Sequence, residues 1–122
     1  MDVGLVSEVA FKFSEDKGRI LENIIFLYLY NKFSEIYYYK TKNNFEVDFL
    51  AKDGGKTREL MQVSWNLSDK NTKKRELRAL TEAMDELKIK RAKIVTYDEM
   101  DEIRIDDKTI KVIPAWRWLL EE

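Results

Sequence analysis

The chain has 122 residues, of which 44% are hydrophobic and 37% charged, and it contains neither histidine nor cysteine. These absences exclude imidazole acid–base chemistry, thiolate nucleophiles, disulfides and the usual zinc or iron sites. The 22 lysines and arginines nearly balance the 23 aspartates and glutamates, so a net charge of −1 predicts no general attraction to nucleic acid. Any basic footprint must be local, and any chemistry must rest on carboxylates, lysines, hydroxyls or a hard metal ion.

The first half of the chain predicts one helix and three strands. A cap at Ser14 or Asp16 begins a helix over 17–33, whose nearly all-round apolar character predicts burial on several sides. Strand patterns follow at 35–41, 45–51 and 58–65. Turn-forming residues separate these strands, which predicts an antiparallel meander.

The second half predicts a crossover helix and a further strand. Ser68 or Asp69 caps a helix over 69–87, and an apolar stripe on this helix is suited to lying on the sheet. The stripe consists of Leu77, Leu80, Met84 and Leu87. The next strand, 92–97, is expected to run parallel to a neighbour because a crossover helix precedes it.

The C-terminal part predicts a hairpin of strands 103–105 and 110–113, followed by a short helix after Pro114. No repeat or linker divides the chain. It is therefore predicted to be a single α/β domain over residues 1–122, with a mixed central sheet.

Membrane insertion and export are not predicted. The longest apolar stretch, 24–30, is far shorter than the roughly 20 residues of a membrane-spanning helix. Residues 1–13 lack the charged region and long apolar core of a signal peptide. We therefore expect a cytoplasmic protein with no membrane partner.

Polar side chains on the second and third strands are candidates for a site. Strand alternation places Glu46, Asp48 and Leu50 on one face, opposite Phe45, Val47 and Phe49. Leu60, Gln62 and Ser64 share a face of the third strand. Whether Asp48 and Gln62 lie on the same side depends on a register that sequence does not fix. With Glu22 on the first helix, they would form an oxygen-rich site suited to a hard metal ion, although an ion pair with Arg19 also accounts for Glu22.

The order helix-β-β-β-helix-β, with Glu22, Asp48 and Gln62-Val63-Ser64 at these places, resembles the PD-(D/E)XK nuclease core, the restriction-endonuclease-like fold. Several runs resemble, more closely, the domain of unknown function at the C-terminus of many archaeal and bacterial AAA+ family ATPases. These runs are Gly18-Arg19-Ile20-Leu21-Glu22-Asn23, Tyr38-Tyr39, Glu46-Val47-Asp48-Phe49, Gln62-Val63-Ser64 and Arg75-Glu76.

The start of the chain extends this resemblance. Asp2-Val3-Gly4-Leu5 resembles the segment upstream of that domain, so residues 1–16 are expected to connect to an ATPase module. The four glycines form no Walker loop, and nucleotide hydrolysis would belong to that other module.

The resemblance implies a nuclease site that binds magnesium or manganese through Asp48, Gln62 and Glu22. Ser64 stands where the family has its lysine, and Gln62 replaces a carboxylate. Lys73 or Arg75 on the second helix are candidates for the missing catalytic cation. Two interpretations stay open: a degenerate but working magnesium-dependent DNA nuclease, and an inactive module that binds nucleic acid or protein.

Two surface features predict partners. Five cations crowd the first turns of the second helix, which suits a DNA phosphate, although a solvated face offset by Asp69, Glu76 and Glu82 is the alternative. These cations are Lys70, Lys73, Lys74, Arg75 and Arg78. Trp116 and Trp118 are expected to seal the end of the sheet. If they are exposed, they would instead form a docking patch for the ATPase module or for a second copy in a homodimer.

Overall fold

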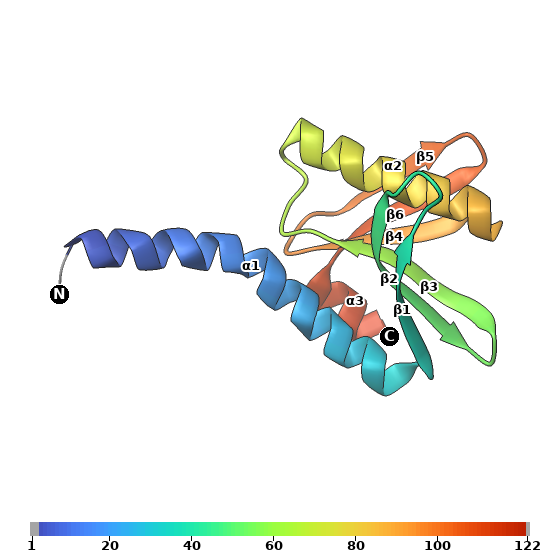
Figure 1. The fold of residues 1–122 in the computed structure, drawn as a ribbon, viewed down its shortest axis with the longest axis horizontal. Coiled ribbons are helices and arrows are strands. Elements are labelled where there is room, and N and C mark those ends of the chain that lie inside the picture. The colour runs from blue at the N-terminus through green and yellow to red at the C-terminus, as the bar shows by residue number, and fades with distance from the viewer. Residues whose placement is uncertain (1–2, 122) are drawn as a thin grey trace.

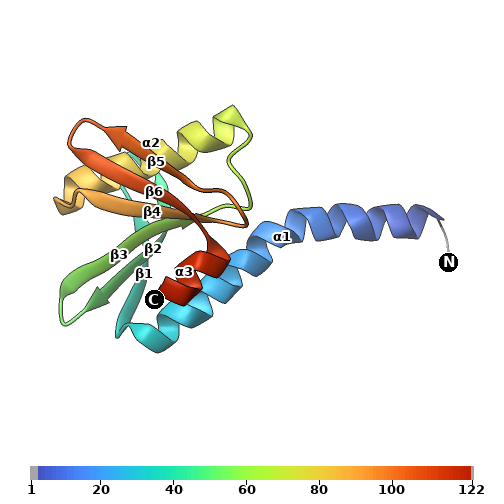
Figure 2. The ribbon, with the colours of Figure 1, turned by 180° about the vertical axis from the view of Figure 1, so that it is seen from behind.

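A computed structural model describes the backbone of residues 3–121 and the side chains of residues 17–121. The helices are α1 (Val3–Lys32), α2 (Lys70–Leu87) and α3 (Ala115–Glu121). The strands are β1 (Glu35–Lys40), β2 (Glu46–Asp53), β3 (Lys56–Val63), β4 (Arg91–Thr96), β5 (Asp101–Ile105) and β6 (Lys108–Pro114). Figures 1 and 2 show three layers, with α2 on one face of the sheet and α1 and α3 on the other.

The six strands form one mixed sheet in the order β1-β2-β3-β4-β6-β5. The meander β1-β2-β3 is antiparallel, as predicted. Helix α2 then carries the chain over so that β4 runs parallel to β3, which confirms the expected crossover. Strand β6 pairs parallel to β4 and antiparallel to β5. The predicted mixed α/β fold class is therefore confirmed.

The core consists of two clusters, one on each face of the sheet. On the α2 face, Leu80 and Met84 are fully buried against strand residues such as Ile94 and Ile110. Leu77 and Leu87 pack at the margin of this cluster, so the predicted stripe of α2 is confirmed. On the opposite face, α1 and α3 pack together over the sheet, with Trp118 at the centre.

Helix α1 differs from the prediction in two ways. It begins at Val3 rather than near residue 17, because the segment before Ser14 has no proline and nothing in it ends a helix. Over residues 17–32 it also buries only one stripe, since the sheet lies on one side of it. Leu21, Ile25 and Leu29 are buried, whereas Tyr30 is 69% exposed.

The N-terminal half of α1 extends away from the sheet (Figure 1). The resemblance at residues 2–5 lies outside the side chains that the structure describes. No helix within residues 3–121 is long and apolar enough to cross a bilayer.

Asp69, one of the two residues predicted to cap α2, is its N-cap. Its side chain accepts a hydrogen bond from Asn71 N at 2.9 Å. We expect Asp69→Ala to lower the free energy of unfolding by about 1 kcal/mol, because it leaves a helix N–H without its acceptor. Urea denaturation measures this change. The control Asp69→Asn keeps a capping oxygen and should lose less; equal losses would contradict the capping role.

Candidate functional site at the fork of β2 and β3

A β-bulge in β2 positions the central carboxylate. Tyr37 of β1 pairs with Leu50, whereas Tyr39 pairs with Val47, so β2 has one more residue than β1 over this stretch. The extra residue lies around Asp48. Bulges break the alternation of side chains and often redirect one of them next to a functional site.

This bulge corrects the predicted faces of β2. Val47 and Leu50 both pack in the α2 cluster, and Phe49 packs in the α1 cluster. Strict alternation, which placed Val47 with Phe49, is therefore wrong at this point. The sequence carries no glycine here that would have indicated the bulge.

Side chains replace the backbone ladder where β2 and β3 separate, and we call this point the fork. Val63 N donates to Asp48 Oδ2 at 2.8 Å, and Asp48 N donates to Gln62 Oε1 at 2.9 Å. Gln62 Nε2 donates to the Glu46 carbonyl at 2.9 Å. Gln62 is only 1% exposed. Its amide therefore holds two backbone groups of β2 in place, and its oxygen already accepts one hydrogen bond.

A hollow of about 410 Å³ opens at the fork beside α2. It brings carboxylates of β2 and α2 together with two arginines of α2. Its lining residues are Asn44, Phe45, Glu46, Asp48, Gln62, Arg75, Glu76, Arg78 and Ala79.

Burial raises the pKa of Asp48 from its ordinary value of 3.8 to about 6. The hydrogen bond from Val63 N and the charge of Arg75 oppose this rise, whereas the negative charges of Glu22 and Glu46 add to it. Desolvation and like charges both disfavour an ionised carboxylate. The positive charge near Asp48 is thus too small to offset the cost of ionising this buried carboxyl group.

Burial also disfavours the ionised form of Glu76 on α2. Burial raises its pKa from 4.5 to about 7, and the charge of Asp48 adds to the rise. Arg75 lowers it, with its Nη2 atom 3.7 Å from Glu76 Oε1. The Arg75 side chain is 66% exposed and that of Glu76 only 14% exposed. Arg75 therefore offsets the two carboxylates in part while remaining accessible to an incoming anion.

The other predicted site residues differ in whether they reach the fork hollow. Glu22 is half-buried on α1 and acts on the pKa of both Asp48 and Glu76. Ser64, which the resemblance to nucleases places where they have a lysine, donates to the Asn66 carbonyl at 2.8 Å. Lys73 is half-buried but does not line the hollow. Of the two candidate cations, the structure places Arg75 at the site.

The remaining cations of α2 divide into two kinds. Lys70 and Lys74 are exposed beyond the hollow. Arg78 lines it, with its guanidinium 4.2 Å from the centre of the Phe45 ring. The aromatic contact fixes the direction of Arg78 at the rim of the hollow.

Within residues 17–121, no three acidic side chains lie close enough to form a metal cage by themselves. Mg²⁺ commonly binds through one or two carboxylates and takes its other ligands from water and substrate phosphates. Asp48 and Glu76 are the pair suited to that mode, because a cation beside them would offset the burial and the nearby negative charges that raise their pKa values.

Residues 17–118 match the sequence model of the Domain of unknown function (DUF4143). The chain belongs to the DUF4143 family. It is also 39% identical over 120 residues to the uncharacterized protein MJ1544 of Methanocaldococcus jannaschii, an alignment that covers 91% of this chain. The chain spans only 26% of the length of that relative. No solved structure matches this chain.

Glu76 lines the fork hollow but was not among the site residues predicted from the sequence. Glu76 lies three and four positions before the buried Ala79 and Leu80, so helical spacing alone places it on the inward face of α2. The sequence therefore contains a signal for the inward position of Glu76. Tyr38 of β1 is 57% exposed, and its hydrogen bond to Glu46 raises its pKa to about 12.

Proposed function

We propose that this DUF4143 domain is a nuclease-like module that acts on DNA together with an AAA+ family ATPase. The fork would bind Mg²⁺ or Mn²⁺ and one DNA phosphate. The observation that carries the proposal is the pair Asp48 and Glu76, two carboxylates whose pKa values are both raised, mainly by burial, in a hollow beside an exposed Arg75. Such pairs occur where a protein is shaped for a positive ligand.

The topology supports the choice of a restriction-endonuclease-like core. A helix, three antiparallel strands, a crossover helix and a fourth strand parallel to the third occur in that order. Asp48 lies on the second strand, as the resemblance implies. The ATPase partner rests on the resemblance to the C-terminal domains of such ATPases.

The residues of the fork would have different roles in catalysis. A bound divalent cation supplies Lewis acidity toward a phosphodiester and lowers the pKa of water. Asp48 and Glu76 would hold the cation, and Gln62 would fix Asp48 through its backbone N–H. Arg75 would stabilise negative charge that develops on the phosphate and would stand in for the lysine that PD-(D/E)XK nucleases have at the position of Ser64.

One observation favours a second candidate, a module that binds DNA or protein without cleaving it. The Ser64 hydroxyl is turned to the Asn66 carbonyl, and the Gln62 amide is engaged by β2 on both of its ends. A site with these replacements keeps cation binding and phosphate binding but loses much of the activation of water.

Calorimetry followed by a cleavage assay tests the proposal. Mn²⁺ titrated into the wild-type protein should give binding heat, and Asp48→Ala should abolish it. Glu35→Ala, which removes an exposed carboxylate of β1, should bind as the wild type does. Equal heats for the wild type and Asp48→Ala would contradict the cation site. Mn²⁺-dependent cleavage of DNA that Asp48→Ala abolishes identifies a nuclease, whereas cation binding without cleavage identifies the second candidate.

A further inference from the structure

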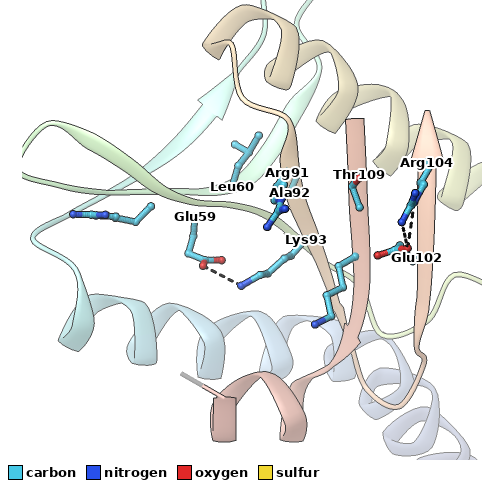
Figure 3. A pocket seen from close by; sticks show the side chains of 10 residues that line it. Glu59, Leu60, Arg91, Ala92, Lys93, Glu102, Arg104 and Thr109 are labelled. Atoms are coloured by element: carbon cyan, nitrogen blue, oxygen red, sulfur yellow. Dashed lines mark hydrogen bonds and ion pairs between the residues drawn. The ribbon is translucent and has the colours of Figure 1, made fainter. Parts of the chain in front are cut away.

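A second hollow, of about 550 Å³, lies on the sheet face that carries α3, and it is strongly basic. Figure 3 shows it from close by, with the labelled side chains of Glu59 and Lys93 pointing toward one another. Five cations and two carboxylates line it, in a chain whose total charge is −1. These charged residues are Arg58, Arg91, Lys93, Arg104, Lys111, Glu59 and Glu102. We call it the basic hollow.

The strand register brings the cations together in two rows. In one row, Arg91 of β4 pairs with Thr109 of β6, which pairs with Arg104 of β5. In the next row, Lys93 lies directly beside Lys111, which has Glu102 on its other side and Glu121 of α3 at 4.0 Å. Like charges on neighbouring strands are unfavourable for a sheet. An anion above these rows would relieve that repulsion.

The carboxylates in the hollow offset only part of this charge. Glu59 accepts from Lys93 Nζ at 3.0 Å, and Glu102 accepts from Arg104 at 3.2 Å (Figure 3). Within the described chain, Arg91 makes no ion pair and is exposed. Arg58 is exposed at a second β-bulge, where β3 has one more residue than β2. Two guanidinium groups are therefore available to a phosphate, which they bind in a planar, two-point contact.

The composition of the hollow favours nucleic acid over protein. Its two aliphatic lining residues, Leu60 and Ala92, belong to the core on the opposite face of the sheet. Protein interfaces have an apolar centre with few charges, whereas nucleic-acid interfaces are polar and strongly positive. No aromatic ring lines the hollow, so it offers contacts to phosphates and no platform for stacking bases.

We propose that the basic hollow binds the phosphodiester backbone of DNA, at a place separate from the fork. The choice of DNA rests on the proposed function. None of the five cations of the basic hollow lines the fork hollow. The domain would thus contact one DNA molecule at two places, or a second segment of DNA while the fork holds the first.

Fluorescence anisotropy of a short labelled DNA duplex, measured over a range of salt concentrations, tests this inference. Arg58→Ala/Arg91→Ala should weaken binding and make the log-affinity versus log-salt slope shallower by about one to two units, at about 0.9 per lost contact. Lys40→Ala/Lys56→Ala removes the same charge from exposed positions outside both hollows and should bind as the wild type does. Equal affinity and slope for the two double variants would overturn the inference.

Two further experiments distinguish failure of this inference from failure of the proposed function. Binding that only Lys73→Ala/Arg75→Ala weakens would place DNA on α2 alone, which overturns the basic hollow and leaves the fork proposal standing. In NMR spectra of the wild-type protein, DNA should shift the amide signals of residues 91–93 and 109–111. If inorganic tripolyphosphate or an acidic peptide shifts these signals and DNA does not, DNA is the wrong occupant.

Discussion

Asp48→Asn is expected to stabilise the folded protein by about 1 to 2 kcal/mol at about pH 8, because one unit of pKa shift corresponds to about 1.4 kcal/mol. The pKa of Asp48 is raised to about 6 and that of Glu76 to about 7 in the fold. The folded state therefore binds more protons than the unfolded chain between about pH 4 and pH 7. Stability must fall as pH rises through this window.

Urea denaturation at several pH values measures this dependence. The contribution of the pair to stability should be complete below about pH 4 and lost above about pH 7. Asparagine retains an oxygen for Val63 N and removes the charge, so the variant should lose less stability across the window than the wild type. Glu76→Gln should behave likewise. An Asp48→Asn protein that is less stable than the wild type at high pH would contradict the raised pKa of Asp48.

Trp118→Ala is expected to be the most destabilising single change, with a loss of about 3 to 5 kcal/mol in the free energy of unfolding. Trp118 is fully buried where α3, α1 and the sheet meet, and its ring packs edge-on against Tyr28 with a centroid distance of 5.0 Å. Alanine would leave a large cavity between the three elements. Denaturant unfolding followed by circular dichroism measures the loss.

Two controls separate packing from hydrogen bonding and from surface effects. The indole N–H of Trp118 has no hydrogen-bond partner among the described residues, so Trp118→Phe should cost much less than alanine. Trp116 is 59% exposed, and Trp116→Ala should leave stability nearly unchanged. A loss at Trp116 as large as that at Trp118 would contradict this assignment. The expected sealing role thus holds for Trp118 alone.

Much of the fold is predictable from the sequence because its signals are local. Alternating strands, turn residues and the stripe of α2 predict each element within a few residues. The start of α1 is not predictable in this way, since a cap at Ser14 or Asp16 acts only where the preceding segment is not itself helical. The burial of α1 depends on how much of its surface the sheet covers, which is a tertiary property.

The fork shows why only part of the site is predictable. Residue chemistry identifies Asp48 and Gln62, but the bulge that brings Asp48 to the fork depends on the pairing of β1 with β2. Glu76 joins the site through the packing of α2 on the sheet. The deciding feature, the burial of Asp48 and Glu76 beside one hollow, arises from elements that are separate in sequence.

Paramagnetic broadening of amide NMR signals by Mn²⁺ most directly tests whether the fork holds a divalent cation. Val63 N donates to Asp48 Oδ2 at 2.8 Å, so a cation at Asp48 would lie close to that amide. We predict that a small amount of Mn²⁺ broadens the signals of Asp48, Val63 and Glu76 first, and that Asp48→Ala prevents this. Broadening centred on exposed carboxylates such as Asp106 and Asp107, with the fork signals unchanged, would contradict the cation site.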